Sequence, residues 1–324
     1  MDFGITIPNR APIIYPEQVP ARSLLEMARK AEEYGFTSVW VGDSALAKPR
    51  LESVSLLSAI SSITTRVKLG TACMASFPLR NALLLAQQWA TLDQLSEGRT
   101  ILVPCKGGKG GSGDYMIEER VFNLPGKERL EVFEESVEVM KELWTKDKVT
   151  FRGKYYSFED VTVLPKPLQR PHPPIWIVSN VLPTAPSHTR EKAFRRVAKL
   201  GDGWMVTWVS PSEFHENLMS IRSFLKDYGK ATNDFAAAIY YNFNINSSKE
   251  RAFLESKSYL DTYYMRDWPK EFVEKSVAHG TASECIRRIE EFAKAGATTM
   301  MLRPTSKDPL GQLKKIAQDV LPSF

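Results

Sequence analysis

The feature that most constrains the fold of this chain is a repeated alternation between short apolar segments and longer segments with helical periodicity. Eight apolar segments are expected to be strands, and they span 3–7, 38–42, 67–72, 100–104, 175–178, 201–206, 236–245 and 298–302. The clearest helix spans 127–145, where apolar residues recur along one face. Strands that alternate with helices form parallel βαβ units. We therefore predict a single α/β domain over residues 1–324, a (β/α)8 TIM barrel, with a doubly wound open sheet as the second choice.

Long insertions interrupt this alternation after the fourth and the seventh strands. The segments 104–126 and 149–174 both precede the fifth strand, and VTFRGKYYSF in the second segment predicts a hairpin that turns at Gly153. Helical segments fill about 249–279 before the last strand. The proline-rich run PKPLQRPHPP (165–174) leaves a domain boundary open as an alternative. Each half alone, however, has too few strands to close a barrel.

Composition argues against several classes of protein. The net charge of +5 is modest and basic residues are interspersed with acidic ones, so we expect no nucleic-acid partner. No run approaches the roughly 18 apolar residues that cross a bilayer, and the N-terminal apolar run is too short for a secretion signal. The three cysteines form no C-x-x-C pair and the four histidines lack metal-ligand spacing, so we expect no disulfide framework and no metal site. We expect a cytoplasmic protein and a homo-oligomer.

Candidate reactive residues follow the expected strands, because a barrel places its chemistry where strands end and loops begin. Asp43 and Ser44 come directly after the second strand. A carboxylate and a hydroxyl there could transfer protons, or they could only cap and turn the loop. Trp208 follows the sixth strand and could stack on a planar ring or substrate, or simply pack.

A glycine-rich run follows the fourth strand. Residues 108–113 formally fit G-x-G-x-x-G, yet no helix follows directly and the run does not follow the first strand. Both features argue against a dinucleotide fold. A loop over the mouth of the barrel is the better interpretation. Lys106 and Lys109 could contact an anionic substrate from this loop, or they could lie in solvent.

Several segments, in order along nearly the whole chain, resemble one family. They are AEEYGFTSVWVGDS (31–44), RVKLGTA (66–72), LRNALLLAQQWATLDQLSEGR (79–99), ERLEVFEESVEVMKELWT (128–145), VTFRGKYY (149–156), PKPLQRPHPPIWIVSN (165–180), AKLGDGWMV (198–206) and GTASECIRRIEEFAKAGATTMML (280–302). The chain resembles the luciferase-like monooxygenase superfamily, which includes bacterial luciferase and coenzyme F420-dependent reductases and dehydrogenases. Two features depart from the family pattern. Ser44 stands where luciferase has a histidine, and the family's glycine-rich L-G-x-G is replaced by ILVPCKGGKGGSG (101–113).

The resemblance implies a barrel that holds FMN or F420 at the carboxyl ends of the strands. The flavin ring would lean on the end of the third strand, where members often have a non-prolyl cis peptide, expected here between Ala72 and Met74. The residues that would line the ring are Thr71, Ala72, Cys73 and Met74. The cofactor phosphate would be bound after the fifth strand, at Ser179 and Asn180.

Three functions follow from the resemblance. The first is a monooxygenase that uses reduced FMN and oxygen on a small organic substrate, with a separate flavin reductase as its partner because the chain has no convincing nicotinamide site. The second is an F420-dependent dehydrogenase or reductase that transfers hydride without oxygen. The third is a non-catalytic flavin-binding barrel. Asp43 and Ser44 are the expected catalytic residues in the first two cases, and Trp208 and Lys106 the expected substrate contacts.

Overall fold

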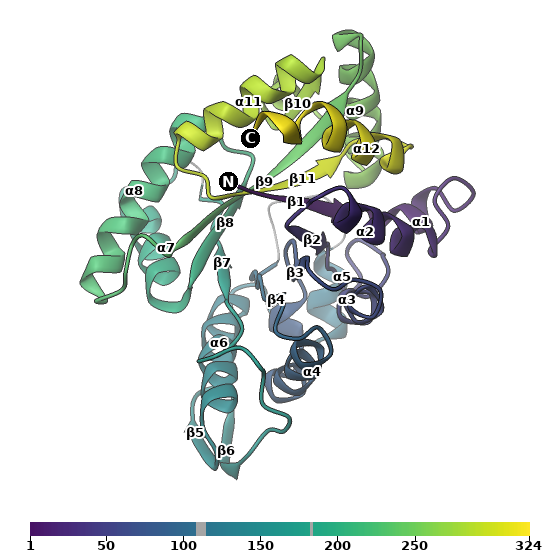
Figure 1. Cartoon of the computed structure of the whole chain (residues 1–324). Helices are drawn as coiled ribbons and strands as arrows, with labels where there is room; N and C mark the ends of the chain where they lie inside the picture. Colours follow the sequence, from purple (N-terminus) through teal and green to yellow (C-terminus); the bar gives the residue numbers. More distant parts are fainter. Residues whose placement is uncertain (108–114, 182–183) are drawn as a thin grey trace.

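The computed structural model describes residues 1–107, 115–181 and 184–324 and contains a parallel barrel (Figure 1). Its eight strands follow one another around the ring in chain order: β1 (Asp2–Ile7), β2 (Ser38–Val41), β3 (Lys68–Thr71), β4 (Thr100–Ile101), β7 (Trp176–Val178), β8 (Gly203–Thr207), β9 (Ala236–Ile245) and β11 (Thr299–Pro304). Strand β1 pairs with β11, and a bridge between Leu102 and Ile175 closes the remaining gap between β4 and β7. The predicted eight-stranded barrel is confirmed.

Helices cover the outside of this ring, as the alternation predicts. Those that follow the barrel strands are α2 (Ser23–Glu33), α3 (Ser53–Ser61), α4 (Ala82–Leu95), α6 (Arg129–Thr145), α7 (Ser187–Leu200), α8 (Pro211–Asp227), α11 (Ala282–Lys294) and α12 (Pro309–Asp319). Capping boxes at Ser210 and Thr281 begin α8 and α11 because each hydroxyl and the glutamate three residues later satisfy the first free amides. Within the described ranges, no helix combines the length and the apolar character needed to cross a membrane.

The insertions fall after the fourth and the seventh barrel strands, as predicted. The hairpin of β5 (Val149–Arg152) and β6 (Ser157–Val161) projects beside α6 at the bottom of Figure 1. Between β9 and β11 lie α9 (Lys249–Tyr264), α10 (Lys270–Ser276) and β10 (Val277–Gly280), a short strand that pairs with the end of β9. The sequence did not predict β10. It also did not predict α1 (Ala11–Ile14), α5 (Tyr115–Val121) or the short 3-10 turns η1 (Phe77–Leu79) and η2 (Leu321–Ser323).

Two tryptophans fill the interior of the barrel. Trp40 of β2 and Trp176 of β7 lie with ring centroids 5.3 Å apart, and Trp40 is fully buried. Gly4 on β1 and Gly70 on β3 make room for Trp40, because a Cβ atom at either position would overlap its ring. The interior around these two rings is therefore a packed core, as in other closed barrels of eight parallel strands.

A buried carboxylate joins two of the segments that carry the family resemblance. Asp93 of α4 is fully buried and accepts hydrogen bonds from the Thr100 hydroxyl (2.6 Å), from the amides of Leu168 (2.8 Å) and Gln169 (3.0 Å), and from the Gln169 side chain (2.7 Å). These bonds hold the proline-rich segment against α4 and the start of β4. The two segments are thus joined directly in the fold by this one side chain.

Candidate active site at the mouth of the barrel

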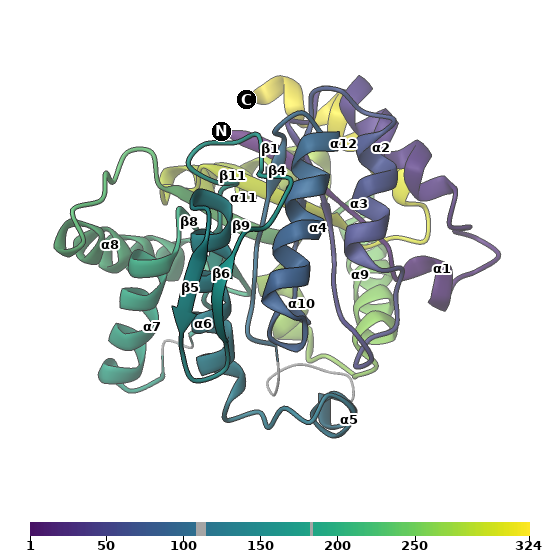
Figure 2. The same cartoon turned by 90° about the horizontal axis from the view of Figure 1, so that it is seen from below.

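The carboxyl ends of the strands form one end of the molecule, opposite the N-terminus, and α5 lies at this end (Figure 2). At the end of β3 the Ala72–Cys73 peptide is cis, within the range where the resemblance placed it. Ala72 and Cys73 are partly exposed and pack on the interior cluster that contains Trp40. Thr71 and Met74 are fully buried, and Met74 packs between barrel and helices. Of the four residues expected to line the flavin ring, Ala72 and Cys73 are thus the two that are partly exposed at the mouth.

The Cys73 thiol contacts a second thiol on the neighbouring strand end. The Cys105 amide donates to the Met74 carbonyl (3.1 Å), which brings the two chain segments together. A hydrogen bond with Cys105, together with burial, raises the pKa of the Cys73 thiol well above its ordinary value. Cys73 is therefore held in its protonated form next to the interior of the barrel.

Asp43 lies at the end of β2 as predicted, but its carboxylate is occupied. One oxygen accepts from the amide (2.8 Å) and the hydroxyl (2.6 Å) of Ser76, and the other accepts from the Ser53 hydroxyl (2.8 Å) and Arg80 Nη2 (2.8 Å). A carboxylate has about four acceptor sites, and all four are used. This geometry favours a role in joining three loops over the predicted proton transfer. Ser44 is partly exposed, and its hydroxyl accepts from the Lys48 amide (3.0 Å).

Four cationic side chains that the sequence analysis did not select gather at the same mouth. We call Arg10, Lys48, Arg50 and Arg303 the cation cluster. Arg10 follows β1, Lys48 and Arg50 follow β2, and Arg303 lies near the end of β11. The residues Arg10, Lys48 and Arg303 are 3%, 8% and 1% exposed. No acidic residue of the described ranges forms an ion pair with any member of the cluster, a rare situation for buried charge.

Tyrosines of β9 and α9 surround these cations. Arg50 donates to the Tyr263 hydroxyl (3.0 Å) and Arg303 donates to the Tyr264 hydroxyl (3.2 Å). The Arg303 guanidinium also lies 4.5 Å from the centre of the Tyr263 ring. Burial alone would raise the pKa of Tyr263, but the charges of Arg50, Arg303 and Lys48 lower it to about 7. Burial lowers the pKa of Lys48 to about 8.

The two predicted substrate contacts, Trp208 and Lys106, are not part of the cation cluster. Trp208 has a positive φ of 63° and packs against Tyr264, Trp268 and Phe272, with ring centroids 5.6 to 5.8 Å away. This arrangement supports its packing role. Lys106 is exposed. The glycine-rich run at 108–113, including Lys109, lies outside the described residues.

The family model of luciferase-like monooxygenases matches residues 1–299. The chain belongs to this family. A curated relative, an F420-dependent glucose-6-phosphate dehydrogenase of Amycolatopsis mediterranei, is 26% identical over 338 aligned residues, which cover 95% of this chain and 96% of the relative. A second F420-dependent glucose-6-phosphate dehydrogenase, from Kineococcus radiotolerans, is 26% identical over 94% of both chains.

Solved structures of similar shape agree with the barrel. The monooxygenase RslO1 of Streptomyces bottropensis has a TM-score of 0.82 at 22% identity, over 100% of this chain and 99% of that one. An F420-dependent secondary alcohol dehydrogenase in complex with an F420–acetone adduct has a TM-score of 0.80 at 21% identity, over 98% of both chains. At these identities the likeness establishes the fold.

Polar atoms without partners lie at the strand ends where the sequence resemblance led us to expect the cofactor phosphate. The side-chain oxygens of Ser179, which follows β7, and Thr207, at the end of β8, are buried, and neither has a hydrogen-bond partner among the described residues. Between them the Asn180 side chain accepts from the Thr207 amide (2.9 Å). Buried hydroxyls without partners are costly unless a ligand completes them. These residues therefore fit a phosphate group.

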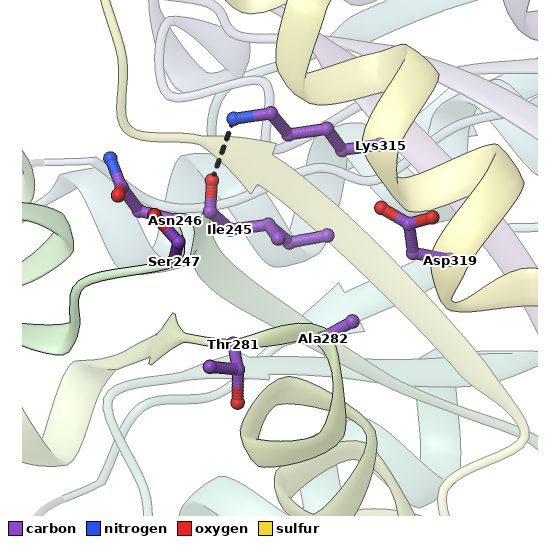
Figure 3. A pocket seen from close by; sticks show the side chains of 7 residues that line it. All are labelled: Ile245, Asn246, Ser247, Thr281, Ala282, Lys315 and Asp319. Carbon is purple, nitrogen blue, oxygen red and sulfur yellow. Dashed lines mark hydrogen bonds between the residues drawn. The ribbon is translucent and has the colours of Figure 1, made fainter.

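A separate hollow of about 400 Å³ lies outside the barrel, between the ends of β9 and β10 and the helix α12 (Figure 3). It is lined by Ile245, Asn246, Ser247, Thr281, Ala282, Lys315 and Asp319. The Lys315 ammonium group donates a hydrogen bond to the Ile245 carbonyl (3.0 Å). The residues of the cation cluster and the residues Ala72, Cys73, Ser179 and Thr207 do not line this hollow, so we place the candidate active site elsewhere.

Sequence signals for the missed residues existed but were not distinctive. Arg10 and Arg303 each stand at the end of a correctly predicted strand, which is where barrel chemistry lies. Tyr263 and Tyr264 fall on a helix of the insertion before the last strand, and nothing in the sequence connects that helix to the mouth. Only the tertiary structure brings these residues together.

Proposed function

We propose that this chain is an F420-dependent oxidoreductase that transfers hydride between a small organic substrate and the deazaflavin. The observation that carries the proposal is its similarity over nearly the whole length to F420-dependent glucose-6-phosphate dehydrogenases. The mouth geometry supports it, because the residues at the ends of β3, β7 and β8 fit a flavin-like ring and its phosphate.

Bound F420 would supply the site that accepts or donates hydride. The hydroxyls of Ser179 and Thr207 would hold its phosphate together with Asn180. Ala72 and Cys73 would support one face of its ring at the end of β3. The packed interior below Trp40 would exclude water from that side.

Oxidation of an alcohol also needs a proton acceptor. We assign this role to Tyr263, because its pKa of about 7 suits proton exchange near neutral pH. Its hydroxyl already accepts a hydrogen bond from Arg50, which stabilises the ionised form. Tyr263 thus takes the role that the sequence analysis gave to Asp43.

Cofactor titration tests the proposal. The purified chain is titrated with F420, FMN and reduced FMN, and binding is followed by fluorescence. We expect F420 to bind more tightly than either flavin. Binding of reduced FMN without F420 would replace the proposal with the monooxygenase first expected, which would need a separate flavin reductase. Cofactor binding without turnover of any alcohol, aldehyde or sugar phosphate would favour a non-catalytic barrel.

The phosphate contacts are tested with Thr207→Val. This change keeps the shape of the side chain and removes a hydroxyl that has no hydrogen-bond partner among the described residues. We expect F420 affinity to fall roughly 10- to 100-fold, the usual worth of a hydrogen bond to a charged group, with no loss of stability. The control is Thr145→Val at the exposed end of α6, which should leave affinity unchanged.

A further inference from the structure

We propose that the cation cluster binds an oxyanion carried by the substrate, so that the enzyme acts on a small acidic molecule, either a phosphate ester or a carboxylate. That the oxyanion belongs to a substrate rests on the proposed oxidoreductase function, but the anion site itself is argued from its own geometry.

Buried guanidinium atoms without acceptors are the first observation. Arg10 Nε and Nη1 and Arg303 Nη2 are buried, and none of the three has a hydrogen-bond partner in the part of the chain that the structure describes. Arg303 uses its other nitrogens on Asn242 Oδ1 (2.8 Å) and the Tyr264 hydroxyl (3.2 Å), which fixes the direction of Nη2. A buried charged donor without an acceptor is strongly unfavourable. A bound oxyanion supplies the acceptors that these atoms lack.

The balance of charge is the second observation. The cation cluster carries up to four positive charges, and Asp43, whose charge acts on Arg50, is paired with Arg80. Tyr263 can contribute one negative charge when ionised. Even then, positive charge exceeds negative charge among the described groups of the mouth. Arginine forks bind both oxygens of a carboxylate or phosphate, which fits a cluster that contains three of them.

The position of the cluster separates it from the cofactor phosphate. Its members come from β11, β1 and β2, which are neighbours in the ring. The unpartnered hydroxyls of Ser179 and Thr207 come from β7 and β8, on the opposite arc of the same ring. The mouth can therefore hold two anionic groups at the same time, the cofactor phosphate on one arc and the substrate oxyanion on the other.

The experiment compares the full-length wild type with Arg10→Met. Binding of inorganic phosphate and of acetate is measured by calorimetry and by thermal shift, against sodium chloride at equal ionic strength. We expect phosphate or acetate to raise the melting temperature of the wild type more than chloride does. Arg10→Met should bind that anion roughly 10-fold more weakly or worse, and yet melt at a higher temperature without ligand, because a buried charge without an acid partner has been removed.

The opposite signs of these two effects identify a binding residue, because loss of a structural arginine would lower the melting temperature. Arg22→Met, an exposed arginine before α2, controls for net charge and should change neither quantity. Should Arg10→Met fail to fold, Arg303→Lys keeps the charge but loses Nη2, and it should also weaken anion binding.

The outcomes separate this inference from the proposed function. A preference for phosphate identifies a phosphate ester, and a preference for acetate identifies a carboxylate; either supports the proposal. Equal effects of all three salts would overturn it. The proposal would also be overturned if F420 abolished the anion binding that Arg10→Met weakens, since the cations would then hold the cofactor phosphate. Failure of F420 to bind, with the anion still bound, would sink the proposed function and leave the anion site standing.

Discussion

At the scale of single residues, Asp43 and Tyr263 differ in what surrounds them more than in their place at the mouth. Asp43 lies at a strand end, where barrels place reactive groups, but every acceptor site of its carboxylate is used inside the chain. Tyr263 lies on an inserted helix, and three cations act on its hydroxyl. Sequence position predicted the first residue correctly as a mouth residue. Only the partners indicate what each residue can do.

Replacement of Asp43 tests this contrast. Asp43→Asn keeps the size of the side chain but puts an amide donor against Ser53 or Arg80 and leaves part of the network unpaired. We expect a loss of about 2–4 kcal/mol in the free energy of unfolding, measured with urea. Asp234→Asn, at an exposed aspartate before β9, is the control and should be neutral.

A different result would restore the role first predicted for Asp43. If Asp43→Asn keeps full stability and F420 affinity but turns over roughly 100-fold more slowly, its carboxylate acts as a proton-transfer group. Ser44→Ala distinguishes the neighbouring hydroxyl in the same assay.

The lowered pKa of Tyr263 predicts a pH dependence of stability. The ordinary pKa of tyrosine is 10.0 and that of Tyr263 is about 7. Between these values the unfolded chain holds a proton that the folded chain has released, so the free energy of unfolding rises with pH over this range. The contribution is complete above pH 10 and is lost as the pH falls through 7. Lys48, with a pKa of about 8 against 10.5, acts in the same direction at higher pH.

Tyr263→Phe isolates that contribution. The difference in stability between wild type and this variant should grow from pH 7 to pH 9, and the ultraviolet absorbance of ionised tyrosine near neutral pH should disappear. Tyr228→Phe, at an exposed tyrosine, should change neither. If the wild type shows no ionised tyrosine below pH 9, the assignment of Tyr263 as proton acceptor is wrong.

At the scale of elements, the strength of the local pattern explains what could be predicted. All eight barrel strands were expected within a few residues, because buried parallel strands are short apolar runs between capped helices. The strand β10 was not, since its sequence VAHG is too short to show a period and follows α10 directly. The helix α5 was also missed. It is held by tertiary contacts, in which Glu118 accepts from the amides of Leu46 and Ala47 and pairs with buried Arg129.

The link between α4 and the proline-rich segment predicts the effect of one substitution. Asp93→Ala removes an acceptor that serves the Leu168 and Gln169 amides and the Thr100 hydroxyl. These buried donors then lack partners, and we expect a loss of about 3 kcal/mol or more in the free energy of unfolding. The exposed Asp319→Ala on α12 should cost much less. Equal losses in the two variants would contradict the anchoring role of Asp93.

At the scale of the whole molecule, the contact between β4 and β7 bears on domain organisation. The backbone amide of Trp176 donates to the Leu102 carbonyl (2.9 Å). This bond joins the strands on either side of the proline-rich segment, so both halves of the chain are needed to close the ring. We propose that residues 1–324 unfold as one domain. Far-ultraviolet circular dichroism and tryptophan fluorescence should then give coincident urea transitions. Two separated transitions would instead support a domain boundary near 165–174. The expected homo-oligomer is a further prediction, tested by light scattering.

Order along the chain determined how much of the mouth could be foreseen. Residues that directly follow strands, such as Asp43, Ala72 and Ser179, were placed at the mouth from sequence alone. The cation cluster and its tyrosines were not recognised, because their significance lies in missing partners. A missing partner is a property of the surroundings in space, which no local pattern records.

The contact between Trp40 and Trp176 also bears on the order in which cofactor and substrate bind. The packed interior around these two rings blocks the amino end of the strands, so we expect no ligand to enter or leave the barrel from that end. Cofactor and substrate must then both bind through the carboxyl end, and the one that binds deeper has to bind first and dissociate last. Initial-rate and product-inhibition measurements should therefore indicate an ordered mechanism. Trp40→Ala, which leaves a cavity in the packed interior, should lower the free energy of unfolding without letting the larger cofactor bind from the amino end.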